Sequence, residues 1–166
     1  MKRDVQFILN GKPVTFSVEP RTSLLRALRE YGLTSVKRGC EEGECGTCTV
    51  VIDDVPQKSC MVLALEAEGK SVLTAEGLIG PKGELHPVQK AFIEEGAIQC
   101  GFCTPGMVMS AYAFLRKNLN PTEEEIRTAL AGNLCRCTGY IPIFRAVRRA
   151  AAEMRELAGA PAGAGR

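Results

Sequence analysis

The eight cysteines of this 166-residue chain fall into two groups of four, and this grouping limits the possible fold more than any other feature. One group lies within residues 40–60 and the other within residues 100–137. The groups are Cys40, Cys45, Cys48 and Cys60, and Cys100, Cys103, Cys135 and Cys137. Four thiolates are a complete ligand set for one metal centre, so the grouping predicts two separate centres.

The first group has the spacing Cys-x4-Cys-x2-Cys, and eleven further residues separate Cys48 from Cys60. This is the plant-type spacing for a 2Fe–2S cluster. Gly39, Gly43 and Gly46 lie in the same loop, where glycine lets the backbone bend and point N–H groups at the sulfurs. Zinc is usually held by two Cys-x2-Cys pairs, and this group contains one, so the spacing favours iron–sulfur over structural zinc.

The second group combines a Cys-x2-Cys pair with a distant Cys-x-Cys pair, a spacing that by itself leaves zinc open. Both pairs stand just before predicted helices that begin near Pro105 and Pro142. Free amides and the positive end of a helix dipole stabilise thiolates and a reducible cluster. The setting therefore favours a redox centre.

Composition and charge exclude several other classes of protein. The chain is 45% hydrophobic and 24% charged with a net charge of +2, which argues against disorder and against a polycation that binds nucleic acid. It has neither the apolar core of a signal peptide near its start nor a run of ~18 apolar residues for a membrane span. We therefore expect a cytoplasmic protein, where cysteines serve metal or redox chemistry more often than disulfides. For a secreted chain, four disulfides would remain an alternative.

The residue pattern changes from β-rich to helical along the chain. Alternating or continuous apolar residues predict strands at 5–9, 14–18, 49–52, 55–58 and 71–74, with a hairpin turn at Asn10–Gly11 that can extend through Lys12–Pro13. Caps and helical spacing predict helices from Ser23 to near Gly32 and at 60–66, 87–95, 105–117, 122–132 and 142–157. The fold class is α+β, with domains at 1–77 and 85–157, a linker at 78–84 and a flexible tail at 158–166.

Three motifs around the cysteines resemble the iron–sulfur subunit of the molybdenum hydroxylases, the family of xanthine dehydrogenase, aldehyde oxidoreductase and carbon monoxide dehydrogenase. The motifs are residues 39–50, 99–106 and 132–140, and the resemblance runs in order from about Lys12 to Ala152. It implies a plant-ferredoxin-like β-grasp domain followed by a bundle of four helices, each domain with one 2Fe–2S cluster.

The resemblance also implies cofactors, partners and site residues. The outer cluster, facing a medium subunit that binds FAD, would be held by Cys40, Cys45, Cys48 and Cys60. The inner cluster, next to the molybdopterin-type molybdenum cofactor of a large subunit, would be held by Cys100, Cys103, Cys135 and Cys137. Gln99 would hydrogen-bond the pterin, and the Cys137 side would touch the pterin amino group.

The implied role is electron transfer within an oxidoreductase, with no catalytic residue on this chain. Electrons would pass singly from molybdenum through the inner and outer clusters to FAD. An iron–sulfur cluster accepts one electron at a time, so two such clusters suit a position between two two-electron centres. The implied assembly is a dimer of heterotrimers. The large subunit would select the substrate, which in this family is a purine, aldehyde, N-heterocycle, carbon monoxide or aromatic acyl thioester.

Some residues depart from the pattern or have a simple structural explanation. Position 41 is often glycine, and here Glu41 and Glu42 add negative charge that should disfavour reduction of the outer cluster. His86 precedes Pro87 and is expected at a helix start without a catalytic role. Arg136, between two cysteines, either compensates thiolate charge or faces solvent. The arginines of residues 145–155 are interrupted by Glu153 and followed by Glu156, and no aromatics interleave with them, so we expect no nucleic-acid binding.

Two other classes of protein remain alternatives. A stand-alone ferredoxin-like carrier would use the first cysteine group and leave the second half of the chain unexplained. An interaction module stapled by zinc would explain eight thiolates without redox chemistry.

Overall fold

The computed structural model describes residues 1–159, so most of the predicted tail at 158–166 lies outside the described residues. The strands are β1 (Arg3–Leu9), β2 (Lys12–Val18), β3 (Thr49–Ile52), β4 (Val55–Lys58) and β5 (Ser71–Leu73). The α-helices are α1 (Leu24–Glu30), α2 (Pro87–Glu94), α3 (Thr104–Leu115), α4 (Glu123–Leu130) and α5 (Ile141–Leu157). Three short 3-10 helices are η1 (Ser59–Met61), η2 (Ala64–Ala67) and η3 (Ala75–Leu78). The predicted α+β class is confirmed.

The strands form one mixed sheet with the order β2-β1-β5-β3-β4. β1 is antiparallel to β2 and parallel to β5, and β3 is antiparallel to both β4 and β5. Asn10 and Gly11 both have left-handed backbone, with φ of 50° and 78°, so they close a two-residue hairpin turn and Lys12 already belongs to β2. Asp53 and Asp54 do the same between β3 and β4.

Helix α1 covers one face of this sheet. Because apolar and polar residues alternate along β1, its apolar side chains are the ones that point towards α1. Val5, Phe7 and Leu9 are buried, and so are Leu24, Leu25 and Leu28 from α1. These residues share one core. The Ser23 side chain accepts a hydrogen bond from the Arg26 amide, which confirms its predicted role as the helix cap.

The single helix predicted at residues 60–66 is wrong in one respect. Val62 and Leu63 are extended between η1 and η2. The reason is tertiary, because the Val62 carbonyl accepts from the Leu24 amide at 2.7 Å and the Ala64 amide donates to the Thr22 carbonyl at 2.8 Å. These bonds tie the segment to the start of α1 and divide it into two turns.

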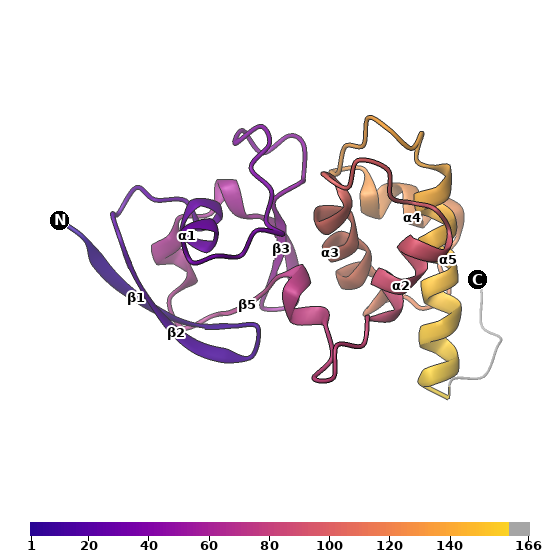
Figure 1. The fold of residues 1–166 in the computed structure, drawn as a ribbon, viewed down its shortest axis with the longest axis horizontal. Coiled ribbons are helices and arrows are strands. Elements are labelled where there is room, and N and C mark those ends of the chain that lie inside the picture. Colours follow the sequence, from indigo (N-terminus) through magenta and orange to yellow (C-terminus); the bar gives the residue numbers. More distant parts are fainter. Residues whose placement is uncertain (160–166) are drawn as a thin grey trace.

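Four helices, α2 to α5, make up the second half of the chain, as predicted (Figure 1). Each of α2, α3 and α5 has a proline in its first turn, where the missing N–H costs nothing. Thr122 and Glu125 form the predicted capping box of α4. A second core lies between these helices and includes Met107, Leu115, Ile126, Ile143 and Val147.

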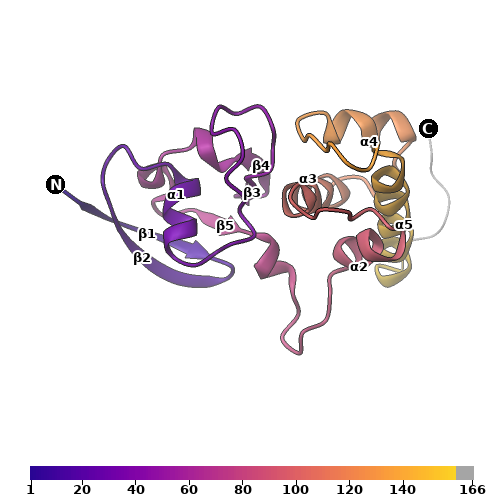
Figure 2. The ribbon, with the colours of Figure 1, turned by 45° about the horizontal axis from the view of Figure 1, so that its top comes forward.

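Strand β3 connects the two cores because both of its faces are covered. Val50 and Ile52 belong to the core under α1, whereas Val51 belongs to the core of the helices. Figures 1 and 2 show α3 lying beside β3. An uninterrupted apolar strand such as Thr49–Ile52 is typical of a strand buried on both sides. The division into domains at residues 77 and 85 stays our prediction.

None of the helices within residues 1–159 combines the length and the apolar character needed to cross a membrane.

Candidate metal centres

The first cysteine group is assembled by the loop before β3 together with the β3–β4 hairpin. Cys48 stands just before β3 and Cys60 just after β4, and the pairing of Thr49 with Lys58 brings the two ends together. Ser59 fixes this junction, since its amide and hydroxyl both donate to the Cys48 carbonyl, at 3.3 and 2.7 Å. The hairpin therefore explains why Cys60, twelve positions after Cys48, joins the loop.

The thiols of this group lie in two pairs. The sulfur of Cys40 accepts hydrogen bonds from the amides of Cys45 and Glu42, both at 3.4 Å, and contacts the Cys45 thiol. These amides, that of Cys45 first, lower the pKa of Cys40 to about 7. Burial, followed by contact with Cys48, raises the pKa of Cys60 to about 11. One pair thus favours the thiolate and the other is shielded from water.

Gly46 shows why this loop needs glycine. Its φ is +69°, and a Cβ there would lie 2.3 Å from the Gly132 carbonyl oxygen, in the loop after α4. The loop around the first cysteine group therefore packs backbone to backbone against the segment that leads into the second group. No larger residue fits this approach without displacing that segment.

The second group is formed by the turn before α3 and the loop between α4 and α5. The sulfurs of Cys100 and Cys137 are 3.5 Å apart, and Cys103 contacts Cys135. Burial, followed by this contact, raises the pKa of Cys103 to about 12. Burial also opposes ionisation of Cys135, but hydrogen bonds from Thr138 outweigh it, so the pKa of Cys135 lies below its usual value.

The two thiol pairs of the second group differ in exposure, so one side of the group is open to solvent. Cys100 and Cys137 are exposed, whereas Cys103 and Cys135 are partly buried. All four line a cavity of about 430 Å³. Phe102 and Leu134 also line this cavity, and these residues are 46% and 54% exposed. The accessible side of this group therefore carries apolar residues.

The sequence-predicted residues around this group occupy the following places. Gln99 is exposed and immediately precedes Cys100. Cys103 is the residue before the first turn of α3, as predicted, whereas Thr138 to Tyr140 separate Cys137 from α5. Arg136 faces solvent at the rim of the cavity, which agrees with one of its two predicted roles. His86 caps α2, where its Nδ1 accepts from the Val88 amide at 3.2 Å, so the expected helix-start role is confirmed.

Glu41 differs from the sequence expectation of added negative charge. Its carboxylate is paired with both Arg26 and Arg38, at 2.9 and 2.6 Å. Hydrogen bonds from Arg26 and then Arg38 hold its pKa below the usual range. The charge beside Cys40 is thus compensated by two guanidinium groups.

Sequence reasoning missed Asn133, which connects the two groups. Its side chain is buried and donates to the Gly46 carbonyl at 2.9 Å and the Thr49 hydroxyl at 3.3 Å, while it accepts from the Ser110 hydroxyl at 2.7 Å. Next to it, the Leu134 amide donates to the Cys45 carbonyl at 2.9 Å. The sequence carries no local signal for these contacts, because Gly46, Thr49 and Cys45 are more than eighty positions away and Ser110 lies on a different element, 23 positions away.

Tyr140 makes a polar contact within the second group. Its hydroxyl accepts from the Cys135 amide at 3.0 Å, and its own backbone is left-handed with φ of 68°. This residue holds the turn that contains Cys135 and Cys137 against the start of α5.

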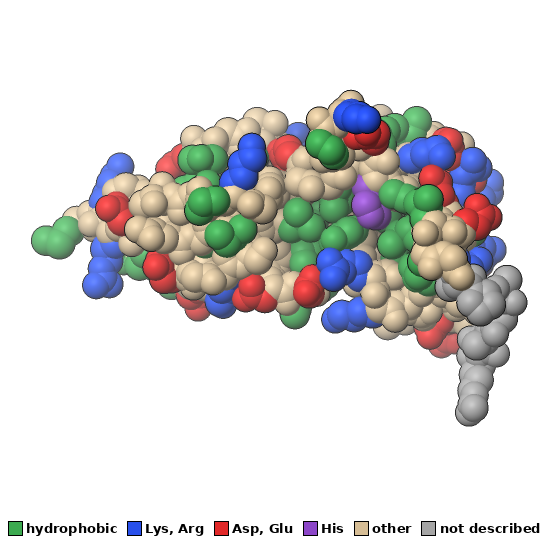
Figure 3. Space-filling view, turned by 90° about the horizontal axis from the view of Figure 1, so that it is seen from below, with side chains coloured by type: hydrophobic (Ala, Val, Ile, Leu, Met, Phe, Trp, Pro, Cys, Tyr) green, Lys and Arg blue, Asp and Glu red, His purple; other side chains and the backbone are tan. Residues whose placement is uncertain are grey.

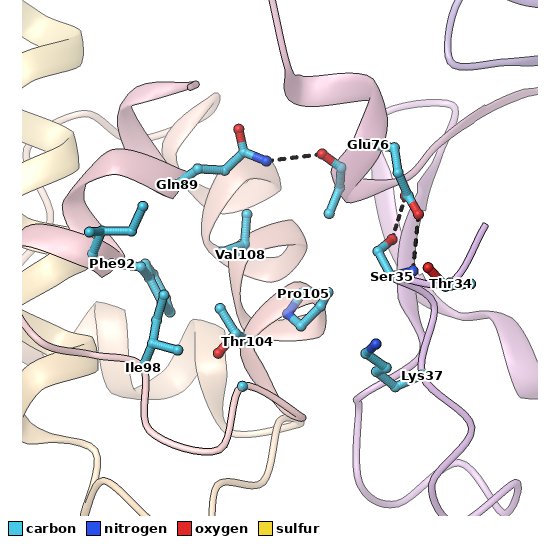
Figure 4. A pocket seen from close by; sticks show the side chains of 13 residues that line it. Thr34, Ser35, Lys37, Glu76, Gln89, Phe92, Ile98, Thr104, Pro105 and Val108 are labelled. Atoms are coloured by element: carbon cyan, nitrogen blue, oxygen red, sulfur yellow. Dashed lines mark hydrogen bonds between the residues drawn. The ribbon is translucent and has the colours of Figure 1, made fainter. Parts of the chain in front are cut away.

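A second cavity, of about 480 Å³, lies between the two halves of the molecule. Its walls are residues 34–37 and 75–76 on the sheet side and residues 89–108 on the helical side. Figure 3 shows hydrophobic side chains gathered in this region, beside the single histidine of the chain. In Figure 4, Gln89 bonds the Ala75 carbonyl at 3.0 Å and Glu76 accepts from Ser35. The cavity forms only where the two halves pack together.

Within residues 1–159, no three cysteine, histidine, aspartate or glutamate side chains converge on one point as the ligands of a single ion. The thiols lie instead in pairs, two pairs to each group. In a 2Fe–2S cluster four thiolates are shared between two irons, so paired thiols with backbone N–H groups on a sulfur are a donor set that fits it.

Comparison with known families agrees with two such centres. A family described as "2Fe-2S iron-sulfur cluster binding domain" matches residues 7–75. A second family, described as "[2Fe-2S] binding domain", matches residues 74–148. The first match includes Cys40, Cys45, Cys48 and Cys60, and the second includes Cys100, Cys103, Cys135 and Cys137.

Individual relatives match over nearly the whole chain. The nicotinate dehydrogenase small FeS subunit of Eubacterium barkeri is 50% identical over 150 residues, which are 90% of this chain and 95% of the relative. The xanthine dehydrogenase iron–sulfur-binding subunit of Escherichia coli O157:H7 is 49% identical over 145 residues, 86% of this chain and 91% of the relative. A chain of quinoline 2-oxidoreductase from Pseudomonas putida 86 superimposes with a TM-score of 0.90 at 45% identity, covering 96% of this chain and 99% of the other.

Proposed function

This chain belongs to the iron–sulfur subunits of the molybdenum hydroxylases, and on that premise we propose that it conducts electrons between a molybdenum-cofactor subunit and an FAD-binding subunit. The chain has two 2Fe–2S binding domains and is part of an oxidoreductase. A 2Fe–2S cluster, when bound, takes up and releases one electron at a time. The residues described below would hold two such clusters and connect them.

We assign one cluster to each cysteine group. The outer set is Cys40, Cys45, Cys48 and Cys60, and the inner set is Cys100, Cys103, Cys135 and Cys137. The pairing of thiols within each set supports this assignment. In the outer set the amides of Glu42 and Cys45 donate to the Cys40 sulfur, which stabilises negative charge there.

The observation that carries the proposal is the hydrogen bond from the Leu134 amide to the Cys45 carbonyl, at 2.9 Å. Cys45 belongs to the outer set, and Leu134 is bonded to Cys135 of the inner set. A short path of covalent bonds and one hydrogen bond therefore joins a ligand of one cluster to a ligand of the other. Asn133 holds this path in place, because its buried side chain donates to the carbonyl of Gly46, the residue after Cys45.

The inner set is the proposed contact with the molybdenum cofactor. Cys137 and Cys100 line the cavity and are exposed, and Gln99, the residue before Cys100, is exposed as well, so a partner subunit can reach all three. The exposed apolar residues Phe102, Leu134 and Ile141 lie near the same cysteines in the chain and suit a covering subunit surface. We propose that Gln99 donates a hydrogen bond to the pterin and that the Cys137 side touches the pterin amino group.

The proposed assembly is a dimer of heterotrimers, each with this chain, a large subunit that holds the molybdenum cofactor and a medium subunit that holds FAD. We place the complex in the cytoplasm, since a reducing compartment keeps all eight thiols available to iron. Native mass spectrometry of the complex purified from its source tests this, and a mass equal to one copy of each chain would contradict the paired assembly.

The metal content tests the central proposal. Purified protein should be brown, with about four iron and about four acid-labile sulfide per chain, and reduction should produce two distinguishable EPR signals. Colourless protein with about two zinc per chain would instead favour the zinc-stapled interaction module. Iron at half the expected level, with one EPR signal, would favour a carrier with the outer cluster alone.

A variant at Gln99 tests the proposed contact with the molybdenum cofactor. Gln99→Ala should leave iron content and both EPR signals unchanged, yet slow the reduction of the clusters by substrate in the assembled complex. The exposed Gln6→Ala change, on β1, is a control in which the reduction rate should stay the same. An unchanged rate in the Gln99 variant would contradict its proposed contact with the pterin.

A further inference from the structure

Glu41, the residue after Cys40, has a backbone conformation that glycine normally supplies. Its φ is 56°, in the left-handed region that disfavours residues with a Cβ. A surrounding contact must hold such a residue in place, because the loop would otherwise relax to a more favourable conformation.

This conformation has a consequence for the neighbouring sulfur. The amide of Glu42 follows directly and donates to the Cys40 sulfur at 3.4 Å, alongside the amide of Cys45 at the same distance. Two backbone amides that converge on one sulfur stabilise negative charge there. Relaxation at Glu41 would turn the Glu42 N–H away from Cys40.

Two arginines hold Glu41 in this position. Arg26, on α1, donates from Nε to one carboxylate oxygen at 2.9 Å and from Nη2 to the other at 3.4 Å. Arg38, two residues before Cys40, donates from Nε to the second oxygen at 2.6 Å. The Glu41 side chain is only 24% exposed, less than half as much as either arginine. We refer to these three residues as the Glu41 clamp.

We propose that the Glu41 clamp sets the reduction potential of the outer cluster, with Arg26 and Arg38 as positioning residues. The clamp keeps the Glu42 N–H on the Cys40 sulfur, and it offsets a carboxylate that stands next to a cluster ligand. Both effects favour the more negative, reduced cluster. The inference rests on the proposed function, because it requires a cluster on Cys40, Cys45, Cys48 and Cys60.

An EPR-monitored redox titration of the purified protein tests this. In Arg26→Gln the midpoint potential of the outer cluster should become more negative, with the ratio of reduced to oxidised cluster at a fixed potential falling about two- to fivefold. The inner cluster should titrate as in the wild type. The control is Arg21→Gln, which removes the same charge from an arginine that is 91% exposed and pairs with Glu19.

A second substitution separates the clamp from a simple loss of positive charge. Glu41→Gly removes the carboxylate and tolerates left-handed backbone, so Arg26→Gln should have little further effect on the potential in that background. The same effect of Arg26→Gln in both backgrounds would overturn the proposal. If Arg26→Gln alone loses the outer cluster, Glu41→Gly should restore it, and failure to do so would also overturn the proposal.

The outcomes distinguish this inference from the proposed function. Wild-type protein without iron and sulfide would refute the proposed function itself. Two intact clusters with an unchanged outer potential in Arg26→Gln would leave the proposed function in place and refute the role of the clamp.

Discussion

Substitution of Asn133 by alanine tests whether one buried side chain holds the two cysteine loops together. Asn133 and Ser110 are 5% and 6% exposed, so neither can exchange its lost partner freely for water. The substitution removes hydrogen bonds of 2.7, 2.9 and 3.3 Å. Each is worth about 1 kcal/mol net, and the Ser110 hydroxyl loses its partner, whereas the Gly46 carbonyl keeps two donors from Thr49. We expect a total loss of about 3 kcal/mol.

For a chain of this length that loss corresponds to a fall in Tm of about 6–12 °C. Thermal unfolding of the cluster-loaded protein, followed with a dye and by the visible absorbance, measures it. Asn120→Ala is the control, because Asn120 is an exposed asparagine in the loop between α3 and α4, and its Tm should change by less than about 2 °C. Ser110→Ala combined with Asn133→Ala should be less harmful than the sum of the two. A Tm near that of the wild type in Asn133→Ala, or strict additivity, would refute the reasoning.

Three further predictions concern packing and pH. Gly106→Ala is expected to destabilise the protein, although helix propensity alone would favour alanine in α3, because the new Cβ would lie 2.3 Å from the Gly46 carbonyl oxygen. Gly132→Ala, whose Cβ would have no contact closer than 3.6 Å, is the control and should leave the Tm unchanged in the same melting assay. Burial lowers the pKa of His86, so its contribution to stability is present above the 6.5 of a free histidine and is lost as pH falls. Between about pH 7.5 and about pH 5.5 the Tm of the wild type should therefore fall. The fall should be smaller in His86→Asn, which keeps a capping side chain but cannot be protonated in this range. Burial alone would raise the pKa of Glu76, but hydrogen bonds from Ser35 and Thr74 hold it below the 4.5 of a free glutamate. The stabilisation that Glu76 provides is therefore present above that pH and lost below it. Glu76→Gln should lower the free energy of unfolding by about 1 kcal/mol at neutral pH, after allowance for its half-exposed site, and should make stability depend less on pH below about pH 4.5.

Much of the fold could be predicted from short segments of sequence because it depends on neighbouring residues. The turn at Asn10–Gly11 follows from two residues that tolerate left-handed backbone, and the start of α4 follows from a threonine and a glutamate three positions apart. The extended break at Val62 could not be predicted in this way. Its hydrogen-bond partner, Leu24, is remote in the chain, and the local residues alone are compatible with a helix.

The same distinction between local sequence and tertiary structure applies to the two candidate metal centres. Cysteine spacing alone determined that two sets of four thiols exist and that each belongs to its own half of the chain, because ligands close in sequence cannot lie far apart in space. Only the tertiary structure decided how the halves meet. Packing of α3 against β3 places the Cys45 carbonyl on the Leu134 amide and Asn133 between the loops, and the position of α1 brings Arg26 to Glu41. Those contacts join residues that are from fifteen to almost ninety positions apart, and their energy depends on the packed cores that hold both partners in place.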